Sequence, residues 1–204
     1  MPAEIRTTQV GPWGMNTYVI VDPAAGRSAI VDPGADAETI LALTADTTVD
    51  KILLTHAHPD HWGALAEVKE ATKVPVYLHP AETAAYDVPF DVPLAGGQII
   101  ELGELQLQTV HTPGHTPGMI CFKIDHRIIV GDTLFVGGPG KTWSPEEFVT
   151  TLRTLQEIVF VWPDETEFYP GHGSSGTIGQ ERPAFEAFVA RGWPADLYGD
   201  VTWE

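Results

Sequence analysis

The feature of this sequence that most limits its fold is a group of histidines and aspartates that follows short apolar segments. The segment His56–His61 has the sequence His-Ala-His-Pro-Asp-His and follows the apolar run Lys51–Thr55. His56 and His58 are two residues apart, so in an extended chain their side chains project to the same side. Pro59 then bends the chain, and the Asp60-His61 pair can aim at a neighbouring point. This pattern predicts two adjacent metal sites rather than one.

Three later turns carry the same types of ligand, namely His115, Asp132 and His172, each next to a glycine or a Pro-Gly pair. Glycine lets the backbone approach a crowded ion closely. Asp132 directly follows the apolar segment Arg127–Val130, where a carboxylate is costly unless an ion balances its charge. Imidazole and carboxylate ligands without a thiolate favour Zn²⁺, Fe or Mn over a structural cysteine site.

The charges of such a centre suit hydrolysis. With two divalent ions, two carboxylates and one hydroxide, about one positive charge remains to stabilise an oxyanion intermediate. A single buried histidine is usually a hydrogen-bonded spectator, and we interpret His79, His111 and His126 in this way. His111 lies four residues before His115, so we expect it to support a ligand rather than to be one.

The pattern of apolar segments predicts a layered α/β or α+β domain, with two sheets packed face to face and helices outside. The length of 204 residues suits one domain, and we expect residues 1–204 to form it. A buried strand is predicted at 51–55, with further strands at 5–10, 17–22, 28–32, 76–78, 99–102, 105–110, 119–124 and 127–130. Helices are predicted at 36–43, 62–72, 145–159 and 181–189, with Ser144 and Glu147 resembling a capping box at the start of one of them.

Charge and composition exclude several classes of partner. There are 28 acidic and 11 basic residues, for a net charge of −17, so we expect no binding to nucleic acids or anionic membranes. One cysteine excludes an internal disulfide. Without an apolar signal region or a run of ~18 apolar residues, we expect a cytoplasmic location. The Trp- and Tyr-rich segment 191–204 is expected to pack against the domain or against the partner subunit of a homodimer.

The histidine motif resembles the His-x-His-x-Asp-His signature of the metallo-β-lactamase fold, an αββα sandwich of two mixed sheets with helices outside. Further similarity extends through nearly the whole chain, from Asn16-Thr17-Tyr18 and Val31-Asp32-Pro33-Gly34 to Tyr169-Pro170-Gly171-His172. The contexts of His115 and Asp132, namely 111–118 and 131–135, look most like the glyoxalase II branch, the hydroxyacylglutathione hydrolases.

The resemblance implies a role for each of these residues. It implies that His56, His58 and His115 hold one metal, that Asp60, His61 and His172 hold the other, and that Asp132 bridges them. A bridging hydroxide would attack a carbonyl group, with Asp60 and Asp132 as the catalytic carboxylates and two divalent ions, Zn²⁺ first among them, as the cofactor. It also implies that Asp32 is a buried group beneath the histidine-rich loop.

The sequence departs from that branch after His172. Only 32 residues follow, whereas full-length glyoxalase II carries an additional C-terminal helical domain that binds glutathione. We therefore expect a thioester hydrolase with a small-molecule thioester or ester substrate. The sequence does not identify the thiol that carries the acyl group. A lactonase or β-lactamase-type hydrolase is an alternative. A mononuclear Fe(II) persulfide dioxygenase, with His56, His115 and Asp132 as ligands, is another. A non-catalytic binding module would have no use for the full ligand set.

Three residues are predicted to contact substrate. Trp13 and Met15 lie on the glycine-flanked turn 11–15, which can overhang the metals in this fold, so we expect Trp13 to contact an apolar part of the substrate. Lys141 is the nearest basic residue for a substrate carboxylate.

Overall fold

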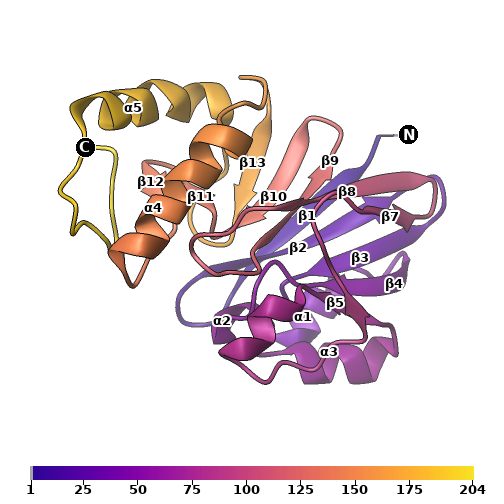
Figure 1. Ribbon diagram of the computed structural model, residues 1–204. Coiled ribbons are helices and arrows are strands. Elements are labelled where there is room, and N and C mark those ends of the chain that lie inside the picture. The colour runs from indigo at the N-terminus through magenta and orange to yellow at the C-terminus, as the bar shows by residue number, and fades with distance from the viewer. Residues whose placement is uncertain (1) are drawn as a thin grey trace.

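Two mixed β-sheets lie face to face in the computed structural model, which describes residues 2–204 (Figure 1). The first sheet has the strand order β1-β2-β3-β4-β5-β6, and the second has the order β14-β13-β10-β9-β8-β7. Strands β11 and β12 form a short separate hairpin. The strands are β1 Glu4–Val10, β2 Met15–Asp22, β3 Arg27–Val31, β4 Thr48–Leu53, β5 Val76–Leu78, β6 Val92–Pro93, β7 Ile99–Leu102, β8 Leu105–His111, β9 Ile120–Ile124, β10 Arg127–Gly131, β11 Leu134–Phe135, β12 Gly138–Pro139, β13 Glu167–Pro170 and β14 Gly176–Thr177.

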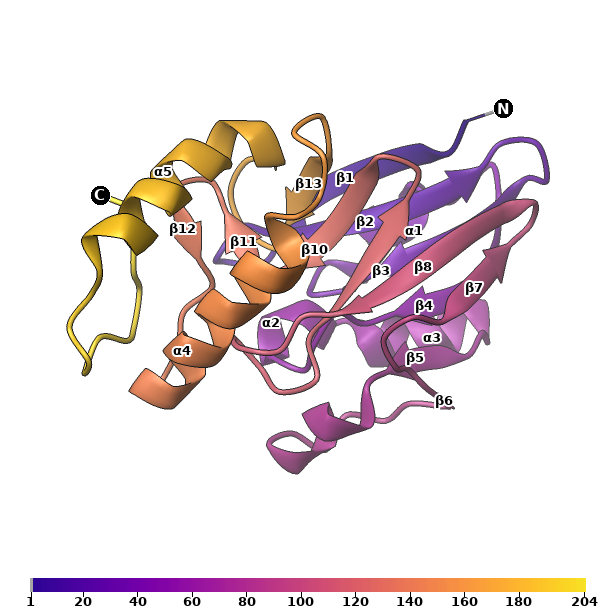
Figure 2. The same ribbon diagram turned by 45° about the horizontal axis from the view of Figure 1, so that its top comes forward.

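Helices cover the outer face of each sheet. Helices α1 to α3 lie against the first sheet, whereas α4 and α5 lie against the second (Figures 1 and 2). The α-helices are α1 Ala37–Ala42, α2 Pro59–Trp62, α3 Leu65–Thr72, α4 Pro145–Thr154 and α5 Ile178–Arg191. A 3₁₀ turn, η1, spans Pro80–Ala84, and a π-helical turn, η2, spans Leu155–Val159.

Strand β2 shows how the layers form. Its alternating side chains point to opposite faces of the sheet. Val19 and Val21 pack in the apolar cluster beneath the first set of helices, while Tyr18 and Ile20 pack between the two sheets. Because both faces are covered, the whole strand is buried. Full burial of one such aliphatic side chain is worth about 1.5–3 kcal/mol. The predicted fold, two mixed sheets packed face to face with helices outside, is confirmed.

Two predicted helices differ from a single regular α-helix. The predicted helix 62–72 is instead α2 and α3, separated at Gly63 and Ala64. At this point the backbone packs tightly on the preceding loop, since the Ala64 amide donates to the Pro33 carbonyl at 3.0 Å and a Cβ on Gly63 would collide with the Gly34 carbonyl. The predicted helix 145–159 is continuous but changes from α4 to the π-helical turn η2 near its end.

Several strands end at the same edge of the sandwich. Parallel strands β3 and β4 end just before Asp32 and His56. Parallel strands β10 and β13 end just before Asp132 and His172, allowing for the Gly171 turn. Strands β8 and β10 run in the same direction because both are antiparallel to β9, so the loop with His115 reaches this edge as well. Residues far apart in the sequence therefore meet at the carboxyl ends of the strands, where open α/β sheets place their ligand sites.

The C-terminal segment after α5 packs against the second layer of helices. Trp203 is buried, and its ring lies 5.3 Å from that of Phe185 and 5.6 Å from that of Phe188. The prediction that this segment packs against the domain is confirmed for its last residues. None of the helices within residues 2–204 has both the length and the apolar character needed to cross a bilayer.

Candidate metal centre

Five histidines and two aspartates meet at the shared edge of the two sheets. We call this set the histidine–aspartate cluster, and it consists of His56, His58, Asp60, His61, His115, Asp132 and His172. Their ligand-type atoms fall into three overlapping groups, in each of which all atoms lie within 4.8 Å of one another. All seven predicted ligands are thus brought together.

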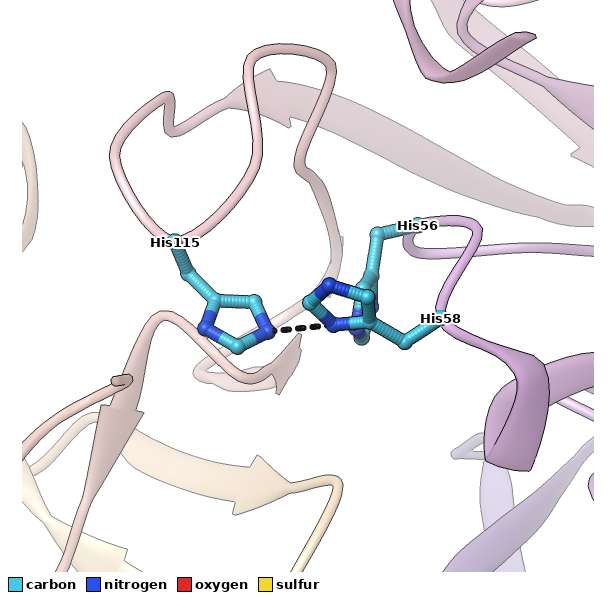
Figure 3. A group of neighbouring side chains, drawn as sticks. All are labelled: His56, His58 and His115. Carbon is cyan, nitrogen blue, oxygen red and sulfur yellow. Dashed lines mark hydrogen bonds between the residues drawn. The ribbon is translucent and has the colours of Figure 1, made fainter. Parts of the chain in front are cut away.

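Three imidazoles form the first group, His56, His58 and His115 (Figure 3). The two from the β4–α2 loop face the one from the β8–β9 loop. His58 Nδ1 lies 3.0 Å from His56 Nε2 and 2.8 Å from His115 Nε2. Three ring nitrogens directed at one point are a typical arrangement for a metal ion held by histidine.

Asp60, His61 and His172 form the second group. His172 Nε2 lies 3.0 Å from Asp60 Oδ2, and His61 Nε2 lies 3.9 Å from the same oxygen. Asp60 and His61 come from the short helix α2, whereas His172 follows β13 on the other sheet. The group therefore joins the two halves of the sandwich.

Asp132 lies between the two groups. Its Oδ1 is 3.4 Å from His61 Nε2, and its Oδ2 is 3.5 Å from His115 Nε2 and 3.9 Å from His172 Nε2. The side chain thus approaches one histidine of the first group and two of the second. Such a position is the one that a bridging carboxylate needs.

Hydrogen bonds fix which nitrogen of each imidazole faces the cluster. His115 Nδ1 donates to the Lys141 carbonyl at 2.8 Å, and His61 Nδ1 donates to Asp32 at 2.9 Å. The Thr55 hydroxyl donates its single proton to Asp32 and so accepts from His56 Nδ1 at 3.0 Å. In all three histidines Nδ1 carries a proton, so Nε2 is the nitrogen that faces the cluster.

Asp32 supports the cluster from below. Its carboxylate accepts three hydrogen bonds, from the Thr55 amide at 2.8 Å, the Thr55 hydroxyl at 2.6 Å and His61 Nδ1. It is fully buried, and its backbone adopts a left-handed conformation with φ of 52°. Single aspartates tolerate this conformation better than most residues. The structure therefore places Asp32 beneath the histidine-rich loop, where the sequence resemblance puts it.

The charges of the cluster call for a cation. Within the described residues, Asp60 and Asp132 form their ion pairs with histidines alone. Burial lowers the pKa of His56, His58 and His115, that of His58 to about 4, so these imidazoles are neutral at pH 7. Burial opposes charge on His61 and Asp132 as well, but Asp132 and Asp32 raise the pKa of His61, and His61 lowers the pKa of Asp132.

Two buried atoms also suit a metal ion. Among residues 2–204, His61 Nε2 and Asp132 Oδ1 are buried and find no hydrogen-bond partner. Buried polar atoms are normally paired, and an unpaired one needs an explanation such as an ion. Neutral imidazole lone pairs, the carboxylates of Asp60 and Asp132 and these two unpaired atoms fit divalent cations. The residues present therefore suit the metals that the resemblance implies.

Two glycines leave room for the cluster. A Cβ on Gly171 would collide with Asp132 and His61, and a Cβ on Gly140 would collide with the Asp132 carbonyl. Both positions can hold only glycine, and at Gly171 this explains the glycine beside the predicted ligand His172.

A cavity of about 1170 Å³ opens above the cluster. Its upper wall, which we call the cavity rim, consists of Trp13, Tyr86, Val136, Lys141, Trp143 and Asp200. Trp13 is 70% exposed, Val136 is 55% exposed and Trp143 is 50% exposed. The ring of Trp143 lies 5.1 Å from that of His58 and 5.3 Å from that of His115. The rim therefore presents aromatic and aliphatic surface directly over the first group of imidazoles.

Of the residues predicted to contact substrate, Trp13 and Lys141 line this cavity, but Met15 does not. Met15 is the first residue of β2, and it is buried in the apolar cluster beneath the helices. Strand alternation explains the difference, because the side chain at this end of β2 turns inward while the preceding turn remains exposed.

The three histidines interpreted as spectators lie outside the cluster. His111 donates from Nε2 to the Pro117 carbonyl at 2.9 Å, and its ring stacks on that of His79 at 4.8 Å. Its contact is thus with the loop that carries His115 rather than with that imidazole. His79 precedes η1 and accepts from the Ala81 amide. His126 lies exposed in the β9–β10 turn.

Glu82 is a buried residue of this site that the sequence analysis did not single out. Its carboxylate accepts from the Ala57 amide at 2.8 Å and from the Gly118 amide at 2.7 Å. It therefore connects the loop of His56 and His58 to the loop of His115, and it holds η1 against both. No local sequence pattern around Glu82 indicates this role, because the two donors lie 25 and 36 residues away in the sequence.

Comparison with known proteins identifies the family to which this chain belongs. Residues 10–175 match the family model described as the metallo-beta-lactamase superfamily. The chain belongs to this superfamily. It is 36% identical to an uncharacterized protein of Aquifex aeolicus over 204 residues, covering 91% of this chain and 96% of that protein. Most members of the metallo-beta-lactamase superfamily are metal-dependent hydrolases, and the fold binds divalent metals.

Two relatives carry the name of one activity. The hydroxyacylglutathione hydrolase of Anaeromyxobacter dehalogenans is 41% identical over 162 residues, which cover 78% of this chain and 62% of that protein. The hydroxyacylglutathione hydrolase GloC of Haemophilus influenzae is 32% identical over 180 residues, which cover 76% of this chain and 84% of that protein. These relatives support the glyoxalase II-like branch of the metallo-beta-lactamase superfamily, as the sequence motifs predict.

Solved structures of the superfamily share this fold. The B3 metallo-beta-lactamase BLEG-1 superposes with a TM-score of 0.79 at 28% identity, over 88% of this chain and 97% of that one. ETHE1 from Myxococcus xanthus superposes with a TM-score of 0.77 at 28% identity, over 88% of this chain and 81% of that one. TTHA1623 in a di-iron-bound form superposes with a TM-score of 0.73 at 33% identity, over 87% of this chain and 96% of that one.

Proposed function

We propose that this protein is a dinuclear metal-dependent hydrolase that cleaves thioesters, similar in chemistry to glyoxalase II. The observation that carries the proposal is the seven-membered cluster, with two groups of three ligands and Asp132 between them. The two relatives named hydroxyacylglutathione hydrolase support the choice of thioesters over other substrates.

Each residue of the cluster has a role in this proposal. His56, His58 and His115 would hold one ion, Asp60, His61 and His172 the other, and Asp132 would contact both. When bound, divalent ions supply Lewis acidity to a carbonyl oxygen and lower the pKa of a water so that it can attack at neutral pH. We propose Zn²⁺ as the metal because neutral imidazoles and carboxylates suit it, and Fe or Mn as its replacements.

The remaining residues orient these ligands and the substrate. Asp32 and the Lys141 carbonyl accept from Nδ1 of His61 and His115, so the Nε2 atoms of both rings are directed inward, where a metal would bind them. Trp13 and Trp143 offer apolar surface to the acyl group. A thiolate leaves without being protonated, so the reaction does not depend on a strong general acid, whereas amide cleavage requires a proton for the departing nitrogen.

Two other activities use the same fold. A lactonase or β-lactamase would use the same attack on a cyclic ester or amide, and the likeness to BLEG-1 keeps this candidate open. A mononuclear Fe(II) persulfide dioxygenase is supported by the likeness to ETHE1. A single iron held by His56, His115 and Asp132 would leave Asp60, His61 and His172 without a role, which favours the dinuclear hydrolase.

Metal analysis and a substrate panel test the proposal. We expect two metal ions per chain and the highest kcat/KM with a thioester among S-lactoylglutathione, a short acyl-CoA-like thioester, an acyl-homoserine lactone and a cephalosporin. A lactone or cephalosporin preferred by more than about tenfold, or about 1.4 kcal/mol of transition-state stabilisation, would overturn the thioester assignment. One iron per chain with O₂ consumption on a persulfide would establish the oxygenase instead.

A further inference from the structure

The charged residues of the cavity wall are unevenly distributed. Among the described residues that line the cavity, Lys141 is the only lysine or arginine. Its Nζ lies 3.0 Å from Asp200 Oδ2, so its charge is compensated by a neighbour. The acidic residues that line the same cavity are Asp60, Glu82, Asp132, Glu147 and Asp200.

Asp200 reaches Lys141 from the far end of the chain. It lies on the segment 192–204, which follows α5 and forms a long loop (Figure 2). Backbone contacts fix this loop against the β11–α4 region, since the Thr142 amide donates to the Gly199 carbonyl at 3.2 Å and the Trp203 amide donates to the Gly137 carbonyl at 2.9 Å. An exposed ion pair contributes little to stability by itself. The position of Asp200 is therefore imposed by the backbone around it.

Asp60 and Asp132 are committed to the proposed metals, and Glu82 is buried under two backbone amides. Away from the metals, the wall that meets the carrier therefore holds Glu147 and the Lys141–Asp200 pair, in which the one lysine is already compensated. Glutathione carries two carboxylates and one ammonium group, so its thioesters bring net negative charge toward this wall. Opposite charge attracts and like charge repels across such a partly exposed wall. The rest of the rim is apolar, with Trp13, Tyr86 and Trp143 facing the cavity.

We infer that Asp200 is a specificity-determining residue, which cancels the charge of Lys141 and directs the cavity to thioesters with an uncharged, apolar carrier. This inference rests on the proposed thioester hydrolysis and adds the class of carrier to it. The C-terminal segment, rather than the cluster, would then decide between anionic and neutral thiols.

A pair of substrates with the same acyl group tests the inference. We would compare the glutathione thioester with the thioester of N-acetylcysteamine, a small uncharged thiol, on the metal-loaded protein. We expect the wild type to prefer the neutral thioester by about tenfold or more in kcat/KM. Asp200→Asn should raise the ratio of anionic to neutral kcat/KM about fivefold, because it exposes the charge of Lys141.

Two further variants separate this effect from a change in overall charge. Asp196→Asn removes one negative charge from the same exposed segment, outside the cavity lining, and should leave the ratio at the wild-type value. The double variant Asp200→Asn, Lys141→Met should lose the gain. A ratio within twofold of wild type in Asp200→Asn, or an equal rise in Asp196→Asn, would overturn the inference.

Binding of uncleavable analogues keeps the inference separate from the proposed activity. S-hexylglutathione and N-acetyl-S-hexylcysteamine are thioethers, and calorimetry gives their Kd without any reaction. In Asp200→Asn, the Kd of the anionic thioether divided by the Kd of the neutral thioether should fall about fivefold. If no variant hydrolyses thioesters but this shift is found, the proposed function fails and the role of Asp200 stands. If thioester hydrolysis is found without this shift in Kd, the proposed function stands and the role of Asp200 fails.

Discussion

The histidine–aspartate cluster and the cavity rim face the same cavity, but they are held in different ways. His56, His61 and Asp132 are buried, and the imidazoles among them are fixed by a second hydrogen bond on the side away from the cavity. Trp13 and Trp143 on the rim are at least half exposed. A change in the cluster must therefore disturb buried polar contacts, whereas a change in the rim meets mostly solvent. In the proposed hydrolase, the cluster would determine the class of reaction and the rim would determine the substrate.

The largest effect that this comparison predicts is the loss of Asp132, the one carboxylate close to both groups. Asp132→Ala should lose bound metal and reduce kcat/KM by about a thousandfold, or about 4 kcal/mol of transition-state stabilisation. Metal analysis and turnover measure the two consequences, with Asp196→Ala as an exposed control. Full metal content with normal kcat would remove Asp132 from the centre.

A somewhat smaller effect is expected beneath the cluster. Asp32→Asn keeps the shape but replaces one accepting oxygen by an NH₂ group, which cannot accept from His61 Nδ1 or Thr55. We expect metal affinity and turnover to fall roughly 100-fold. Metal competition titrations measure the affinity. Asp36→Asn is a matched control, since Asp36 has a similar left-handed backbone but lies exposed on the surface. Equal losses in both variants would point to the loop backbone as the cause.

Glu82 connects two loops of the cluster and lies on η1, which leads to Tyr86 of the rim, so its substitution tests how separate the two regions are. Glu82→Gln leaves one of two buried amides, of Ala57 or Gly118, facing an NH₂ group. An unpaired buried group costs about 1–3 kcal/mol, and each kcal/mol lowers Tm by about 2–4 °C in a domain of this size. We expect kcat/KM to fall about tenfold as both loops loosen. Thermal melts and kinetics should show no change in Glu67→Gln, an exposed control.

The smallest effect belongs to the rim. Trp13→Ala should raise KM about fivefold for thioesters with an apolar acyl group, since the ring covers apolar surface worth about 25 cal/mol per Å². Tm should stay unchanged because the side chain is 70% exposed. Val161→Ala, which removes an equally exposed apolar side chain away from the cavity, should leave KM unaltered. An unchanged KM in Trp13→Ala for every accepted substrate would show that the residue only packs on the surface.

The difference between the two regions also explains what the sequence can predict. Short motifs encode the cluster, because its ligands follow strand ends and glycine turns that can be recognised in the local sequence. The spacing of His56 and His58 and the position of Asp132 after an apolar strand are both visible without the structure. The layered fold follows in the same way from apolar segments of strand and helix length.

The rest depends on contacts between distant segments. Glu82 meets its two donors only after the sandwich has closed, and Asp200 meets Lys141 across 59 residues. Met15, by contrast, is a residue that the sequence predicts to contact substrate but that does not line the cavity. Its place on a glycine-flanked turn predicts exposure, but pairing of β2 with its neighbours turns the side chain into the core. Helix 62–72 is divided because Gly63 lies against the Gly34 backbone, a contact that helical periodicity does not encode.

The C-terminal segment is anchored by aromatic packing at its two ends and by fewer contacts between them. Trp193 stacks on Phe188 at 5.9 Å where the segment leaves α5, and Trp203 is buried where it ends. Between them Leu197 packs on the apolar cluster and Gly199 contacts Thr142, whereas Ala195, Asp196, Tyr198 and Asp200 are exposed. Replacement of these four exposed residues would not disturb the packing that anchors the segment. For protein engineering, this makes the four positions suitable for a randomised library, in which new substrate preferences could be selected while the metal ligands and the folded core stay as they are.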